Sequence, residues 1–108
     1  MHARTTARSL DRTFEILSHP YRRRILFILR SRSPRDVGDF STDALGVDTD
    51  PATLQTSLHH NHLPKLAETE FIEWNRTSDT VRRGPRFDDA VPVLQLIEEQ
   101  IDLPTTGQ

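Results

Sequence analysis

Hydrophobic positions near the start of the chain are spaced as on one face of a helix. Three apolar residues lie at i, i+4 and i+7, namely Leu10, Phe14 and Leu17. This spacing predicts an amphipathic helix over about residues 10–18, with Ser9 as its N-cap. The preceding residues, 1–8, are polar, and we expect them to form a disordered tail.

A denser apolar stripe follows Pro20 and predicts a second helix that ends near Arg32. Proline suits the first turn of a helix, where its missing N–H has no intrahelical partner to lose. Residues 33–40 contain proline and glycine, and we expect a loop or a weak extended segment there. A short third helix then starts at Ser41 or the residue after it, and Gly46 stops it.

The clearest helix start in the chain is Asp50-Pro51. Aspartate is a favoured N-cap and proline a favoured first helical residue, so a fourth helix is predicted from about Pro51 to Glu68. Pro64 lies inside this helix and lacks the backbone donor that an α-helix needs. We therefore expect a kink, or a change to another local geometry, near the end of this helix.

The pattern then changes from helical spacing to alternation. Residues 71–75 alternate as a strand, with Ile72 and Trp74 on one face, and residues 80–83 return as a second strand after a turn at 77–79. A helix followed by a basic hairpin is the layout of a winged helix-turn-helix. The predicted fold is therefore mainly α with a small β-hairpin, in a winged helix-turn-helix arrangement.

A last helix is predicted to begin at Asp88 or Asp89 and to end at about Ile101. With 108 residues the chain is long enough for one domain with a modest core. We place that domain at residues 9–103 and a second tail at 104–108.

Composition narrows the possible functions. Only 34% of the residues are hydrophobic, which predicts a small core and a polar surface. The lack of cysteine excludes disulfides, thiolate metal sites and cysteine nucleophiles. No apolar run is long enough for a membrane span, and the first residues do not resemble a secretory signal, so we expect a cytoplasmic protein.

Charge is segregated along the chain although the net charge is only -2. Residues 20–35 carry six arginines and no acid, whereas acids gather in 36–50 and 88–102. Such segregation can give an acidic protein one basic face, although the charges could equally serve to solvate exposed helices. Arginine outnumbers lysine thirteen to one, which suggests a high-GC genome and a salt-rich cytoplasm.

The arginine triplet 22–24 cannot point to one surface, because successive helical residues are rotated by about 100°. We expect at least one of these side chains to pair with an acid such as Glu15.

The fourth helix and the hairpin contain the candidate DNA-binding residues. Leucines define the core side of the helix, so its other side presents short hydrogen-bonding side chains that suit base edges and phosphates. The hairpin adds arginines that can reach flanking phosphates or a minor groove. The candidates are Thr53, Thr56, Ser57, His60, Asn61, Arg76, Arg82 and Arg83. The alternative is an exposed polar face whose arginines form surface ion pairs.

Two separated motifs resemble ArsR-type winged-helix regulators. Residues 62–66, His-Leu-Pro-Lys-Leu, followed by Phe71-Ile72, resemble the His-Leu-x-x-Leu-x-x-Ala-Gly-Leu-Val stretch of that family. Residues 14–26, Phe-Glu-Ile-Leu-Ser-His-Pro-Tyr-Arg-Arg-Arg-Ile-Leu, resemble its Leu-x-x-Pro-x-Arg-x-x-Ile-Leu helix. With Val-Arg-Arg-Gly-Pro-Arg-Phe at 81–87, the chain is also similar to a group of small haloarchaeal winged-helix proteins of largely unassigned role. The resemblance covers roughly residues 10–100 and implies DNA binding and dimerisation.

The chain departs from the ArsR pattern at two points. Thr69 and Glu70 stand where Ala-Gly usually ends the recognition helix, so we expect Glu70 to strain or change that exit. The cysteine pair of many metal-sensing members is missing, so the resemblance does not imply metal sensing.

A histidine cluster raises a separate possibility. His59 and His62 are three residues apart and could share a helix face, but two imidazoles make an incomplete zinc site. The alternative is that His62 packs beside the core while His60 points outward. We assign no metal site and no cofactor, and a metal-responsive regulator using these histidines and nearby carboxylates stays a further alternative.

We expect a homodimeric DNA-binding transcription regulator that binds double-stranded DNA through helix 51–68 in the major groove and wing 71–83 on flanking DNA. The first and last helices would form the dimer interface, because both carry more apolar residues than a domain of this size needs to cover itself. We expect no enzyme, since the chain lacks a nucleophile elbow, a phosphate loop and a zinc-protease motif. The rival interpretation is a winged-helix module that binds another protein and no DNA.

Overall fold

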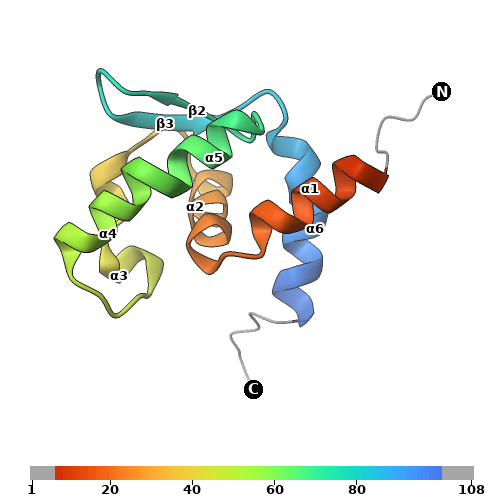
Figure 1. Cartoon of the computed structure of the whole chain (residues 1–108), viewed down its shortest axis with the longest axis horizontal. Helices are drawn as coiled ribbons and strands as arrows, with labels where there is room; N and C mark the ends of the chain where they lie inside the picture. Colours follow the sequence, from red (N-terminus) through yellow and green to blue (C-terminus); the bar gives the residue numbers. More distant parts are fainter. Residues whose placement is uncertain (1–6, 101–108) are drawn as a thin grey trace.

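The computed structural model describes residues 7–100 and is mainly helical, with a small antiparallel sheet (Figure 1). The elements in chain order are α1 (Ala7–Leu17), α2 (Pro20–Ser31), β1 (Arg35–Asp36), η1 (Val37–Asp39), α3 (Thr42–Leu45), α4 (Pro51–Ser57), η2 (Leu58–His62), α5 (Leu63–Glu68), β2 (Ile72–Asn75), β3 (Thr80–Arg83) and α6 (Phe87–Gln100). The expected mainly helical fold with a β-hairpin is confirmed at this level.

Helix α1 begins earlier than the sequence pattern predicted. Its first residue is Ala7, so Ser9 lies inside the helix and the prediction that Ser9 caps it was wrong. Of the predicted tails at 1–8 and 104–108, residues 7 and 8 belong to the first turn of α1, and the rest lie outside the described residues. The end of the last predicted helix, at Ile101, also lies outside them.

Helices α2 and α3 begin and end close to the predicted positions. Helix α2 has Pro20 in its first turn, and the side chain of His19 caps it by accepting from the N–H of Tyr21. Ser41 caps α3, and Gly46 ends it in the left-handed conformation at φ 65°. Glycine adopts that conformation without the steric cost of a side chain.

The sheet has a third strand within residues 33–40, where a loop or a weak extended segment was expected. The strand order is β1-β3-β2, and both pairings are antiparallel. Strand β1 is two residues long, with Arg35 opposite Val81 and Asp36 opposite Thr80. Two residues cannot show the alternation that identifies a strand, so only the fold reveals this pairing.

Residues 51–68, called here the bent helix, form the predicted fourth helix in three parts. Helix α4 passes into the π-turn η2, and α5 follows. In η2 the N–H of Leu63 bonds to the carbonyl of Leu58, five residues earlier. The wider turn lets Pro64 enter the first turn of α5, where it needs no donor and avoids a clash with the preceding turn. The expected change of geometry at Pro64 is confirmed.

The bent helix turns into β2 through a left-handed residue. Glu70 has φ 68°, so the strain expected from the absence of glycine is present. Gly84, after β3, packs against this turn, because a Cβ there would lie 2.4 Å from the Glu70 carbonyl oxygen. The exit of the bent helix and the end of the hairpin are therefore fitted to each other.

One hydrophobic core joins the helices to the sheet. It includes buried residues from α1, α2, the bent helix, the hairpin and α6. Helices α1 and α6 cross at one end of the molecule, away from the hairpin tip and α4 (Figure 1). Across residues 7–100 no helix is both long and apolar enough to cross a bilayer.

Candidate nucleic-acid interface

The bent helix has one buried face and one exposed polar face. Leu54, Leu58, Leu63 and Leu66 are fully buried, as their spacing predicted. Of the five candidates on this helix, Thr53, Thr56, His60 and Asn61 are exposed, and Ser57 is half-buried. Asp50 caps the start of this helix, and its carboxylate accepts from the N–H and the hydroxyl of Thr53 at 3.0 and 3.3 Å. The structure therefore brings these candidates to one accessible surface.

The exposed polar face continues along α5 and includes one cation, Lys65, that was not among the predicted DNA-binding residues. Lys65 is exposed and lines a shallow depression together with His60, Asn61 and Pro64. Glu68, at the end of α5, lies on the same depression. Lys65 could have been found from the sequence, because it is two helical turns from Ser57 on the polar side.

The hairpin presents Arg76 and Arg82 to solvent. Arg82 lies on the outer face of β3, directly opposite Glu73 of β2. Arg76 is at the turn, where its guanidinium carbon lies 4.4 Å from the centre of the Trp74 ring. A cation over an indole face is a favourable contact that restricts the arginine side chain.

Arg83 has a different environment from its neighbour Arg82. Its guanidinium donates to the carbonyl oxygens of Leu29 at 2.8 Å and Arg30 at 2.9 Å. These carbonyls belong to the last turn of α2, where helix carbonyls lack intrahelical partners and attract cations. The geometry thus gives Arg83 a role in joining β3 to α2, although its side chain is exposed like those of Arg76 and Arg82.

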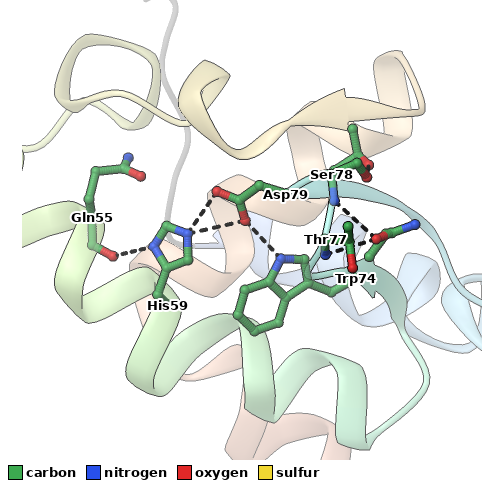
Figure 2. A network of polar contacts seen from close by, with 8 residues as sticks. Gln55, His59, Trp74, Thr77, Ser78 and Asp79 are labelled. Atoms are coloured by element: carbon green, nitrogen blue, oxygen red, sulfur yellow. Dashed lines mark hydrogen bonds and ion pairs between the residues drawn. The ribbon is translucent and has the colours of Figure 1, made fainter.

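A polar network joins the bent helix to the hairpin turn (Figure 2). His59 in η2 hydrogen-bonds through Nδ1 to the Gln55 carbonyl at 2.8 Å and through Nε2 to the Asp79 carboxylate at 2.9 and 3.1 Å. The indole N–H of Trp74 donates to the same carboxylate at 3.1 Å. This network could not be predicted from the sequence, because His59 and Asp79 are 20 residues apart and each type of residue is common on surfaces.

The network changes the proton affinity of both partners. The hydrogen bonds to Asp79 and to the Gln55 carbonyl raise the pKa of His59 above its ordinary value of 6.5, although burial opposes them. Burial alone would raise the pKa of Asp79, but hydrogen bonds from His59 and Trp74 outweigh it and lower that pKa. Both shifts favour an imidazolium next to a carboxylate.

Two arginines of the triplet 22–24 are buried in the fold. Arg22 donates to His62 Nδ1 at 3.1 Å and to the Ile16 carbonyl at 3.4 Å. Burial lowers the pKa of Arg22, and the nearby charge of Glu15 opposes this effect. Arg23 donates to the carbonyls of Leu17 and Ser18, at the end of α1. Arg24 donates to the carbonyl of Leu45, at the end of α3. These cations therefore satisfy carbonyls at helix ends.

His62 packs in the core, as the alternative to a metal site predicted. It is 1% exposed, and its ring centre lies 4.2 Å from that of His19 and 5.4 Å from that of Tyr21. Burial, and then the nearby His19 and Arg22, lower the pKa of His62 to about 4. His62 is therefore neutral at pH 7, with Nδ1 as the acceptor for Arg22.

The histidines of this cluster do not converge on one point. His59 bonds to the hairpin turn, His60 is exposed, and His62 faces α2. Among residues 7–100, no group of three or more His, Asp or Glu side chains is placed to hold a metal ion.

The comparisons with known proteins identify a family without a described function. The model of a family described as a domain of unknown function, DUF7344, matches residues 14–82. The chain therefore belongs to this family, and the match includes the whole bent helix and nearly all of the hairpin. No curated protein and no solved structure matches the chain.

Proposed function

We propose that this protein is a DNA-binding transcription regulator of the winged helix-turn-helix type. The bent helix acts as the recognition helix in the major groove, and the hairpin acts as a wing on flanking DNA. One observation carries the proposal. The exposed polar face of the bent helix is joined through His59 and Asp79 to a hairpin that presents Arg76 and Arg82.

The chemistry of this surface suits duplex DNA. The major groove is wide enough for an α-helix, and short side chains such as those of Thr56 and Asn61 can approach base edges closely. Arginines at the wing can neutralise phosphates or enter a narrow minor groove. The function would place the protein in the cytoplasm with the chromosome.

A homodimer through α1 and α6 completes the proposal. The large hydrophobic side chains exposed among the described residues all lie on these two helices, and they are Leu10, Phe14 and Leu96. A second copy covering this face would place two recognition helices on successive turns of a palindromic site. Sedimentation should show a dimer in the parent, and Phe14→Glu with Leu96→Glu should give a folded monomer. A monomeric parent at micromolar concentration would refute this part.

A protein-binding module is the second candidate, and acids near the proposed surface favour it. Glu73 lies opposite Arg82, Asp50 caps α4 and Glu68 ends α5. These carboxylates interrupt the positive strip that DNA would contact. In this alternative the polar face would bind a basic protein surface, and no duplex would compete for it.

Selection from random duplex DNA, at low and high salt, tests the two candidates. We expect an enriched palindrome that Arg82→Ala binds less tightly than the parent. The matched control is Arg86→Ala. Arg86 lies just before α6 and forms an ion pair with Asp89 in the first turn of that helix, so the variant removes the same charge outside the proposed interface. Equal losses in both variants would mean that net charge, and not the wing, determines binding. No enrichment at any salt, with a folded protein, would refute DNA binding and favour the protein-binding module.

A further inference from the structure

Asp79 connects three elements at the tip of the hairpin. Its carboxylate accepts from His59 in η2 and from Trp74 in β2, and its carbonyl accepts from the N–H of Val37 at 3.0 Å. It adopts a left-handed conformation with φ 56°, which costs free energy for a residue with a side chain. The hairpin turn is therefore shaped so that this carboxylate points at the bent helix.

The partners of His59 define its protonation state in this arrangement. A carbonyl oxygen and a carboxylate can only accept hydrogen bonds. Nδ1 lies 2.8 Å from the Gln55 carbonyl and Nε2 lies 2.9 Å from an Asp79 oxygen. Both ring nitrogens must therefore donate, and only the imidazolium form has two N–H groups. Loss of one proton leaves one of the two contacts without a hydrogen.

We propose that Asp79 is a positioning residue, and that a proton on His59 latches the wing onto the recognition helix. The His59–Asp79 contact, called here the latch, spans the gap between the two parts of the proposed interface (Figure 2). Its effect on DNA binding rests on the proposed function, whereas its effect on the hairpin does not.

The latch also determines where one wing arginine lies. Asp79 holds the indole of Trp74, and that indole carries the Arg76 guanidinium at 4.4 Å. When the latch is closed, Arg76 is held at a defined distance from the bent helix. When His59 loses its proton, the indole and Arg76 become free to move with the turn.

The latch can open without unfolding the protein. The side chains of His59 and Asp79 are 32% and 44% exposed, and a pair this accessible is worth little to global stability. The other charged groups near the turn are Arg76 on the hairpin and Asp36 in β1, opposite Thr80. Neither hydrogen-bonds to His59, so Asp79 is its ionic partner. Opening therefore changes the wing position at small cost.

The first experiment measures the latch in the free protein. The ring protons of His59 are followed by NMR as the pH changes, together with the fluorescence of Trp74, the one tryptophan in the chain. We expect a His59 midpoint above 6.5 and a Trp74 signal that follows the same midpoint.

Two conservative variants separate positioning from simple structural support. Asp79→Asn keeps the shape and tolerates the left-handed backbone, but it removes the charge, so the His59 midpoint should fall. His59→Gln keeps a donor toward Asp79 without a titrating group, so the Trp74 transition should disappear. A parent midpoint at or below 6.5, or a midpoint that Asp79→Asn leaves unchanged, would overturn the latch.

The second experiment measures the consequence for DNA with a duplex enriched in the selection above. Raising the pH through the His59 midpoint should weaken parent binding about fivefold, since one partly exposed pair is lost. The His59→Gln variant should show a flat profile, and Asp79→Asn should lose protection of flanking DNA while keeping the central site. Asp88→Asn is the control, because it removes the same charge as Asp79→Asn from an exposed carboxylate in the first turn of α6, outside the proposed interface.

Failure of the latch and failure of the proposed function give different results. If no duplex is enriched but His59 titrates as expected, the latch exists and the DNA-binding proposal is wrong. If a duplex is bound but His59→Gln follows the parent pH profile, DNA binding stands and the latch has no part in it.

Discussion

At the scale of single residues, the two neighbouring arginines of β3 illustrate how differently the same side chain can be used. Arg82 faces solvent opposite Glu73, whereas Arg83 donates to two carbonyls at the end of α2. The first is available to a partner molecule, and the second holds two elements together.

This difference predicts that two adjacent substitutions change the free energy of unfolding by different amounts. Arg83→Ala should lower the free energy of unfolding by about 1–2 kcal/mol, because the terminal carbonyls of α2 lose charged donors. Arg82→Ala should change it by less than about 0.5 kcal/mol. Urea unfolding followed by circular dichroism measures both, and Arg83→Lys should fall between them, since lysine lacks the planar fork. Equal destabilisation by the two alanine variants would contradict the assigned roles.

The lowered pKa of the single residue His62 predicts that the stability of the protein depends on pH. Its pKa is about 4 in the folded protein against an ordinary 6.5, so the unfolded chain binds a proton that the folded chain does not. Stability should therefore fall as the pH drops from 6.5 to 4, by on the order of 3 kcal/mol, and this group should add nothing further below that range.

The control for this prediction is His62→Asn, which can place an amide oxygen near the position of Nδ1 and so keep an acceptor for Arg22. Its unfolding free energy should change less with pH than that of the parent. Parallel curves for the two proteins between pH 6.5 and 4 would show that His62 is not responsible.

At the scale of elements, the sequence was most informative where local chemistry decides the structure. Ser41 and Gly46 bound α3 as predicted, and Pro64 changes the helix geometry as predicted. For β1 the sequence predicted only a loop or a weak extended segment, because its two residues become a strand only through pairing with β3. Ser9 misled because a cap requires a helix end, and the first helix continues through it.

In the candidate site, too, the sequence predicted what depends on local patterns and did not predict what depends on distant partners. The leucine pattern of the bent helix correctly predicted four of the five exposed polar side chains, and the fifth, Ser57, is half-buried. The tasks of Arg83 and His59 could not be predicted, because their partners lie 54 and 20 residues away in the chain. A sequence pattern gives the face on which a residue lies, and only the packing of the elements gives its partner.

The left-handed conformation of Glu70, at the end of the bent helix, predicts that glycine at this position stabilises the protein. Glu70 is held at φ 68°, where a residue with a Cβ is less stable than glycine by about 1–2 kcal/mol. Glu70→Gly should raise the free energy of unfolding by about 0.5–1 kcal/mol, because part of that gain is offset by the flexibility of glycine in the unfolded chain. Thermal unfolding should show a higher melting temperature.

The matched control replaces a glutamate in an ordinary helical conformation. Glu98→Gly, within α6, should lower stability by about 1 kcal/mol. A Glu70→Gly variant that is destabilised as much as Glu98→Gly would mean that the left-handed turn carries no strain.

At the scale of the whole molecule, the proposed DNA surface has few cations for a protein of this size. Most described arginines bond to helix ends or to acids, as Arg22 and Arg35 do. Lys65, Arg76 and Arg82 are exposed on the proposed surface, and Arg83, which is also exposed, has its guanidinium bonded to the end of α2. Specific binding by this surface would then depend mainly on contacts other than phosphate neutralisation.

This count gives a measurable salt dependence. If each protomer of a dimer places three cations on phosphates, the slope of log affinity against log salt should be about -5. Arg82→Ala removes one contact from each protomer and should reduce the slope to about -3.5, whereas Arg86→Ala should leave it unchanged. A parent slope near -3 would indicate that one protomer contacts the duplex, and a slope that Arg82→Ala does not change would remove that arginine from the interface. Because the slope depends on the number of phosphate contacts and not on the site sequence, it can be measured on any duplex that the protein binds.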